Sequence, residues 1–182
     1  GSKCNICAKT RKLTYEEVKN TVEDLGYKLL SSNYTNNREK LKLEDTDGYK
    51  YTVILDTIKR GIRPGKFNIA NDFTIYNINL WCKINNKPFK LISDNYTGLN
   101  KKLYWQCFKC NEVFECTWSN IRYGNGCGVC YGRQTTLSNC LATLRPDLAK
   151  QWNSYKNGDL TPSNITIGSD KKWIACRPLL LS

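Results

Sequence analysis

The stretch WQCFKCNEVFECTWSNIRYGNGCGVC, from Trp105 to Cys130, decides the fold of this chain. It holds two Cys-x2-Cys pairs, Cys107 with Cys110 and Cys127 with Cys130, and sixteen residues separate them. Two thiolates on each of two tight turns can close a tetrahedron around one ion, which predicts a zinc site. Two disulfides are the alternative, but nothing else in the sequence is typical of a secreted protein. Because four cysteines leave no open position for water, we expect one structural Zn²⁺ that stabilises the fold.

The sequence just before these cysteines recurs 62 residues upstream. Residues 27–41, YKLLSSNYTNNREKL, match residues 89–103, FKLISDNYTGLNKKL, at eight of fifteen positions. With one inserted residue the match continues, and Gly61 then aligns with Gly124. Where the second copy has its cysteines, the first has Asp45, Asp47 or Gly48, Pro64 and Phe67. We therefore expect two copies of one structural unit, of which the first has lost its metal site.

This internal repeat divides the chain into four parts. We expect residues 1–10 to end a preceding unit, 11–70 to form a unit without zinc (unit one), 71–130 to form a zinc-binding unit (unit two), and 131–182 to begin a third, incomplete unit (unit three). Each complete unit is predicted to hold a short helix and a small antiparallel sheet. The predicted fold class is therefore α+β, built from tandem small zinc-ribbon or treble-clef-like repeats.

Local patterns place the elements within each unit. A helix is expected over 14–27, with Thr14 as its cap and Gly26 as its stop, and its equivalent over 76–89 should bury Leu80 and Ile84. Strands are expected at KLLS, KLKLE and YKYTVIL, and a helical turn before each of the glycines at 61 and 124. In unit three, Pro146 is placed to start a short helix, and residues 171–176 resemble the strand that opens a ribbon.

The remaining cysteines are less informative than the two central pairs. Cys4 and Cys7 have the spacing of half a metal site, and their partners could lie upstream or could include Cys176. The other three cysteines lie among apolar neighbours, where free buried thiols are the favoured interpretation. These are Cys82, Cys116 and Cys140.

The chain is strongly basic throughout its length. Its 182 residues carry a net charge of +12, distributed as +5, +3 and +4 over residues 1–70, 71–130 and 131–182. A sustained basic field with interleaved aromatic residues favours nucleic acid as partner, above all duplex DNA, and a merely solvated basic surface is the alternative. Arginine and asparagine can read base edges, and lysine mainly holds phosphate. The candidate contacts are Lys59, Arg60, Arg63, Lys66, Lys101, Lys102, Ser119, Asn120, Arg122, Tyr123, Arg133, Lys171 and Lys172.

The composition also excludes several classes of function. The chain has no histidine, so no Ser-His-Asp triad, Cys-His dyad or histidine-bound catalytic zinc can form within it. The only dense acidic group, Glu44 to Asp47, lies on the turn where unit one has lost its cysteines, so we expect no catalytic residue in this chain. No apolar run approaches the length of a membrane span, and no small-molecule substrate is expected. The richness in lysine and asparagine is typical of AT-rich bacterial and phage genomes, which predicts the cytoplasm of a bacterial host cell.

Residues 141–176 carry a family resemblance. They hold Pro146, Leu148-Ala149, Trp152, Lys156-Asn157-Gly158, Leu160-Thr161-Pro162, Gly168-Ser169, Lys171-Lys172, Trp173 and Cys176 in that order. This pattern resembles a bacterial and phage zinc-ribbon repeat family that often accompanies mobile-element endonucleases, and units one and two look like its related repeats. The resemblance implies a DNA-binding, target-recognition module. It also implies two alternatives, part of an endonuclease whose catalytic domain lies outside this chain, or a protein-interaction module.

Overall fold

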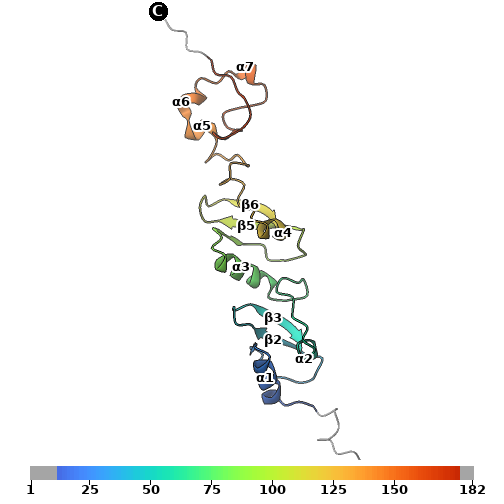
Figure 1. Cartoon of the computed structure of the whole chain (residues 1–182). Helices are drawn as coiled ribbons and strands as arrows, with labels where there is room; N and C mark the ends of the chain where they lie inside the picture. Colours follow the sequence, from blue (N-terminus) through green and yellow to red (C-terminus); the bar gives the residue numbers. More distant parts are fainter. Residues whose placement is uncertain (1–11, 177–182) are drawn as a thin grey trace, which may run out of the picture.

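The elements of the chain follow one another along an elongated molecule. A computed structural model describes residues 12–176, and Figure 1 shows them in sequence order from helix α1 (Tyr15–Asp24) to helix α7 (Ser154–Asn157). The architecture is α+β, with two small antiparallel three-stranded sheets and several short helices, as predicted. No helix in the described range 12–176 has the length and apolar character that crossing a bilayer requires.

Unit one consists of a helix, a three-stranded sheet and a helical turn. Its elements after α1 are β1 (Lys28–Leu29), β2 (Lys40–Glu44), β3 (Lys50–Ile54) and α2 (Leu55–Lys59). Thr14 caps α1 as predicted, because its hydroxyl accepts a hydrogen bond from the Glu17 N–H at 3.3 Å and the Glu17 carboxylate accepts one from the Thr14 N–H at 2.8 Å. Gly26 ends the helical segment with a φ of 82°.

Unit two has the same order of elements. These are α3 (Thr74–Ile84), β4 (Phe89–Leu91), β5 (Lys102–Cys107), β6 (Val113–Thr117) and α4 (Trp118–Arg122), and both sheets place the second strand in the centre. In each unit, a backbone N–H of the central strand donates a hydrogen bond to a serine hydroxyl in the loop before that strand. The Lys42 N–H donates to Ser31 Oγ at 2.8 Å in unit one, and the Tyr104 N–H donates to Ser93 Oγ at 2.7 Å in unit two.

The buried face of α3 differs from the sequence-based expectation. Leu80 and Ile84 were expected to be buried, but the structure buries Ile78 and Cys82 and leaves Ile84 51% exposed. The reason is a longer loop between helix and strand. Both helices end with the same backbone hydrogen bond. The Tyr27 N–H donates to the Val22 carbonyl after α1, and the Lys87 N–H donates to the Cys82 carbonyl after α3. Two further residues then separate α3 from its strand, so the helices align at an offset of 60 and the strands at 62.

Helix α3 lies between the two sheets and bonds to both. Asn77, which is fully buried, accepts from the Lys50 N–H at 2.8 Å and donates to the Lys50 carbonyl at 2.7 Å, so it pairs with the edge of β3. Asn79 exchanges the same two bonds with Leu91 on β4, at 2.7 and 3.2 Å. Phe67 and Trp81 pack against the apolar clusters of both units. Units one and two therefore share a continuous, hydrogen-bonded junction.

Unit three is built mainly from turns and short helices. It contains α5 (Leu141–Leu144), α6 (Pro146–Ala149) and α7, and Pro146 opens α6 as predicted. The expected opening strand at 171–176 does not form, because this stretch makes only a single antiparallel bridge, between Ala175 and Trp152. Stacking of Trp152 on Trp173, with ring centroids 5.0 Å apart, holds the two sides of the unit together.

Candidate metal centre and basic surfaces

The four central cysteines meet at one point. The Sγ atoms of Cys107 and Cys130 are 3.6 Å apart, those of Cys110 and Cys127 are 3.5 Å apart, and all four lie within 4.8 Å of one another. A tetrahedron with zinc–sulfur bonds of about 2.3 Å has sulfur–sulfur edges of about 3.8 Å. A disulfide would need about 2.05 Å. The four thiols are free and could hold a metal ion.

Two tight turns deliver these thiols. Cys107 is the last residue of β5, and its N–H donates to the Glu112 carbonyl at 3.0 Å across the turn. Asn111 takes the left-handed conformation, with a φ of 57°, which redirects the chain into β6 after Cys110. In the second turn, the Tyr131 N–H donates to the Cys127 carbonyl at 3.2 Å. The first turn is therefore an extension of the sheet, and the second follows the end of α4.

The glycines beside Cys127 serve close packing rather than unusual backbone angles. Neither Gly126 nor Gly128 has a positive φ. A Cβ at Gly126 would instead lie 3.1 Å from the Tyr131 ring and 3.2 Å from the Phe89 ring. A Cβ at Gly128 would lie 3.4 Å from Gln134 Cβ. Gly126 therefore lets the second turn approach the sheet closely enough to complete the cluster.

The pKa values of Cys107 and Cys130 are shifted in opposite directions. Burial raises the pKa of Cys130, and the neighbouring sulfurs raise it further. Burial also acts on Cys107, but hydrogen bonds from the backbone of Cys110 and Lys109 outweigh it and lower the pKa of Cys107 to about 7. Sulfur ligates metal as the thiolate, and adjacent thiolates repel one another. A cation at the centre is what would allow all four to ionise together.

The other cysteines lie apart from this cluster. Cys82 and Cys140 are buried and Cys116 is half-buried, as predicted for packed thiols. Cys176 is exposed, while Cys4 and Cys7 lie outside the described residues. Within residues 12–176, the four central cysteines form the only group of three or more potential metal ligands.

Unit one fills the corresponding place with a charged contact. Asp45, at the position of Cys107, accepts hydrogen bonds from the Tyr49 N–H at 2.9 Å and the Tyr51 hydroxyl at 2.6 Å. Lys66 Nζ lies 3.4 Å from carboxylate oxygens of both Asp45 and Asp47, and 3.9 Å above the centre of the Tyr49 ring. The acidic turn of unit one is therefore held by hydrogen bonds and an ion pair within its own fold.

The structure brings three of the predicted nucleic-acid contacts together. Ser119, Arg122 and Tyr123 line one hollow with Leu99, whose carbonyl accepts a hydrogen bond from the Ser119 N–H at 3.0 Å. The Tyr123 side chain is 85% exposed, and Arg122 is exposed and forms no ion pair among the described residues. This surface, at the end of α4, is called the α4 hollow below.

Other predicted contacts are already engaged or lie separately. Arg60 pairs with Asp56 at 2.8 Å and Lys102 with Glu115 at 2.8 Å, while Arg133 donates to the Asn125 side chain at 3.3 Å. Lys66 is held by the acidic turn. The remaining candidates are exposed and are not gathered around the hollow. They are Lys59, Arg63, Lys101, Asn120, Lys171 and Lys172.

Two groups of exposed or pocket-lining lysines lie outside the predicted contacts. The outer face of the first sheet carries Lys40 and Lys42, because alternate residues of β2 point to the same side. In the sequence, the alternation of lysine and leucine in KLKLE indicates that both lysines lie on the exposed face of the strand. A second group surrounds a pocket beside the thiol cluster and comes from the stretch WCKINNKPFK, where three lysines fall within ten residues.

Comparison with protein-family models finds no matching family, and comparisons with curated proteins and with solved structures find no significant match. The resemblance to a zinc-ribbon repeat family therefore stays a prediction carried by the sequence motifs.

Proposed function

We propose that this chain is a zinc-stabilised module that binds duplex DNA, and that zinc occupies the cluster of Cys107, Cys110, Cys127 and Cys130. The observation that carries the proposal is the gathering of Arg122, Tyr123 and Ser119 around the α4 hollow, on a scaffold whose thiol cluster fits tetrahedral zinc. Arginine without an acidic partner is free to meet phosphate or a guanine edge. The module would act as the target-recognition part of a phage or mobile-element protein, as the sequence resemblance implies.

Zinc has a structural role in this proposal. When bound, it would cross-link the turn after β5 to the turn after α4, and the folding free energy of unit two would include its binding free energy. Cys110→Ser removes one ligand, and Cys116→Ser is the matched control, because Cys116 is also half-buried but lies outside the cluster. We expect about one zinc per chain in the wild type and in Cys116→Ser, and loss of zinc in Cys110→Ser, by elemental analysis. Equal zinc content in the two variants would contradict this ligand set.

DNA binding is tested by its dependence on salt. Fluorescence anisotropy with a labelled 20-base-pair duplex should show affinity falling steeply from 50 to 200 mM salt, because phosphate contacts release counterions. Arg122→Ala should reduce the slope of log affinity against log salt by roughly 0.9, the value for one lost phosphate contact. Arg145→Ala is the control, since Arg145 already pairs with Asp147 at 2.7 Å.

The exposed tyrosine provides an independent comparison. Tyr123→Ala should weaken DNA binding, whereas Tyr155→Ala, on α7 and 97% exposed, should not. Salt-insensitive binding, or no binding at 50 mM salt, would sink the proposal. In that case the exposed side chains of the α4 hollow would be better explained by contact with a protein partner.

A further inference from the structure

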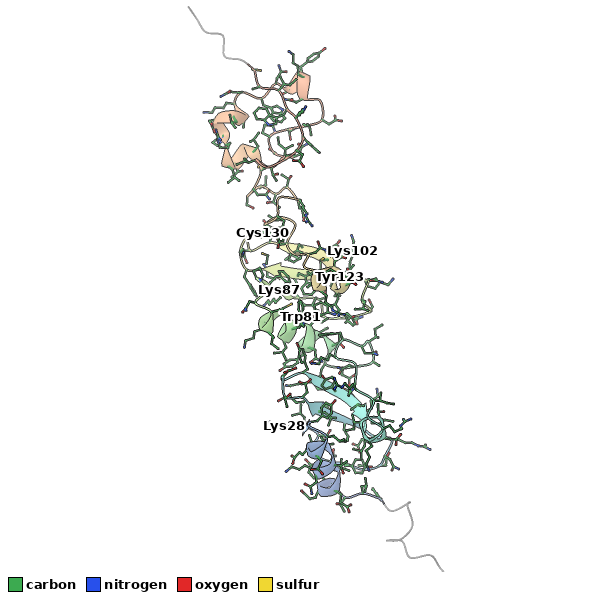
Figure 2. The ribbon with its side chains drawn as sticks, in the orientation of Figure 1. Lys28, Trp81, Lys87, Lys102, Tyr123 and Cys130 are labelled. Carbon is green, nitrogen blue, oxygen red and sulfur yellow. The ribbon has the colours of Figure 1, made fainter. Side chains whose placement is uncertain are left out.

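A second surface of unit two has a different chemistry from the α4 hollow. It is a pocket of about 650 Å³, within the size range of about 300–1,000 Å³ typical of ligand sites. In the view of Figure 2, Tyr123 and Lys102 lie toward one side of unit two and Lys87 toward the opposite side. The pocket is formed where the end of α3, the strand β4 and the first cysteine turn meet. Its lining residues are Asn79, Cys82, Lys83, Asn86, Lys87, Phe89, Lys90 and Phe108.

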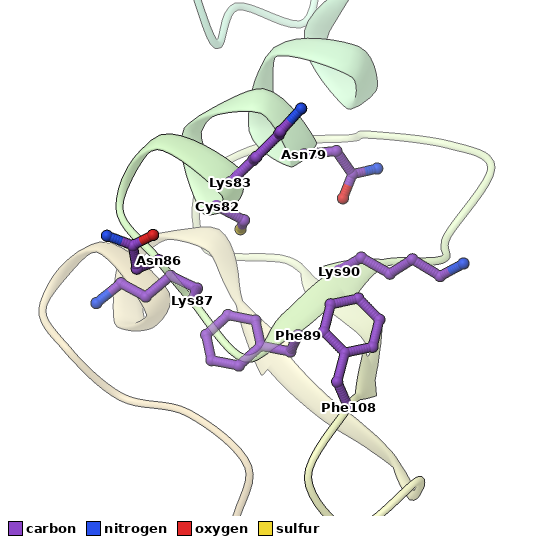
Figure 3. Close-up of a pocket in the computed structure, with 8 residues that line it drawn as sticks. All are labelled: Asn79, Cys82, Lys83, Asn86, Lys87, Phe89, Lys90 and Phe108. Carbon is purple, nitrogen blue, oxygen red and sulfur yellow. The ribbon is translucent and has the colours of Figure 1, made fainter.

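The pocket has an apolar floor and a basic rim. Cys82 and Phe89 are 2% and 4% exposed, whereas the Phe108 ring is 62% exposed. Figure 3 shows Cys82 among Lys83, Lys87 and Lys90, whose side chains extend outward in different directions, and the two phenylalanine rings lower in the view. No acidic residue lines the pocket, and none of the three lysines forms an ion pair within residues 12–176.

The backbone holds these groups in fixed positions. The Lys87 N–H donates to the Cys82 carbonyl at 2.8 Å and the Asn86 N–H to the Lys83 carbonyl at 3.1 Å, which closes the end of α3. On the opposite wall, the Phe108 N–H donates to the Pro88 carbonyl at 2.8 Å. An exposed aromatic ring on a rigid turn loses little conformational entropy when a flat ligand stacks on it.

Unit one shows that the scaffold does not need this pocket. At the offset of 60 that aligns the helices, Lys83 corresponds to Glu23, and at the offset of 62 that aligns the strands, Phe108 corresponds to Thr46. Lys87 belongs to the loop that is longer in unit two. Lys83, Lys87 and the exposed ring are therefore additions to unit two, whereas Lys90 recurs as Lys28 in unit one.

We propose that this pocket takes an unpaired nucleotide of a DNA strand, with the base stacked on Phe108 and the adjoining phosphates held by Lys83, Lys87 and Lys90. Aromatic rings accept any base face, and lysines around them hold the backbone of a single strand. Paired bases in a duplex cannot present a face to such a ring. The inference rests on the proposed DNA binding, and it adds a preference for DNA that carries an unpaired base.

The test compares two 20-base-pair duplexes at one salt concentration, one of them with a central bulged 2-aminopurine. We expect the bulged duplex to bind about 5- to 150-fold more tightly, the range that one stacked base provides, and its fluorescence to fall on stacking. Phe108→Leu keeps an apolar side chain beside Cys107 and should abolish the preference, whereas Phe108→Tyr keeps the aromatic face and should retain it. Both variants should retain one zinc per chain.

The lysines are tested without touching the cysteine turn. The double variant Lys87→Ala/Lys90→Ala should lower the salt slope for the bulged duplex, by about 0.7 for each lost contact to a single strand. The control Lys150→Ala/Lys156→Ala removes the same charge from exposed positions in unit three and should leave it unchanged.

Several results would overturn the inference. They are equal affinity for both duplexes, unchanged 2-aminopurine fluorescence, or a preference that survives in Phe108→Leu. Polyglutamate could also displace the labelled bulged duplex as well as unlabelled bulged DNA does at the same total charge. That result would assign the pocket to an acidic peptide instead. Absence of salt-dependent binding to either duplex is a different result, because it overturns the proposed DNA binding itself.

Discussion

Replacing Asn77 with alanine tests whether units one and two form one rigid piece. The Asn77 side chain is fully buried and makes three hydrogen bonds to unit one, with the Lys50 N–H at 2.8 Å, the Lys50 carbonyl at 2.7 Å and the Lys66 carbonyl at 2.8 Å. At about 1 kcal/mol for each bond, their loss should cost about 3 kcal/mol. The better helix propensity of alanine returns up to about 0.7 kcal/mol. The expected net loss is therefore about 2–3 kcal/mol.

Asn79→Ala is the matched control for this prediction. Asn79 lies on the same helix and makes two bonds, both to Leu91 of its own unit, and it is only half-buried, so water can replace part of what is lost. We expect a cost of about 1 kcal/mol or less after the same gain in helix propensity.

Urea unfolding of the zinc-loaded protein, followed by tryptophan fluorescence, measures both changes. The signal reports on the junction, because the Trp81 and Trp118 rings are 5.1 Å apart and Trp118 also contacts Phe67 at 4.9 Å. With an m-value of about 2 kcal/mol/M, Asn77→Ala should lower the midpoint by about 1 M or more. A midpoint shift no larger than that of Asn79→Ala would refute the reasoning, since the bonds across the junction would then contribute nothing beyond those within unit two.

Two further predictions concern single side chains. Lys66→Met should destabilise unit one by about 1 kcal/mol in the same assay, because it removes the ion pair with Asp45 and the contact with the Tyr49 ring. Lys59→Met, at an exposed position with no ion pair to any residue of 12–176, should change stability by less than about 0.5 kcal/mol. Cys82 should alkylate far more slowly than Cys176 at pH 8, because burial raises the pKa of Cys82 to about 12, and peptide mass spectrometry after iodoacetamide treatment checks this. Equal rates for the two thiols would contradict the burial of Cys82.

The sequence predicted the parts of the fold that depend on local pattern. The two Cys-x2-Cys pairs predicted the four-thiol cluster, because this spacing lets one tight turn present both of its sulfurs to a common point. Thr14 predicted the start of α1 and the alternation in KLKLE predicted β2, because both are local sequence patterns. The prediction of the buried face of α3 was wrong, because the offset of 62 that aligns the strands was also applied to the helices. Two extra loop residues between α3 and β4 make the correct helix offset 60.

The parts that could not be predicted depend on contacts distant in sequence. Nothing in the residue type of Asn77 tells that it will pair with a strand edge 27 positions earlier. The pocket beside the cluster combines α3, β4 and the turn containing Phe108, which only the folded chain brings together. The lysines of its rim were visible in the sequence, but an exposed phenylalanine next to one of the clustered cysteines has no distinguishing pattern of its own.

The shared junction also explains how unit one can fold without a metal. An ion pair joins Asp45, at the position of Cys107, to Lys66, at the position of Val129, and Phe67, at the position of Cys130, packs against Trp118 of unit two. A short helix and a small three-stranded sheet bury little apolar surface by themselves. A unit of this size therefore needs either a bound metal or a neighbouring unit for its stability. Unit one has the neighbour, and unit two has the four thiols. Loss of the thiol cluster in unit two should therefore lower the stability of both units. The core of unit two contains Cys107 and Cys127, and Phe67 and Trp81 pack against this core and against that of unit one.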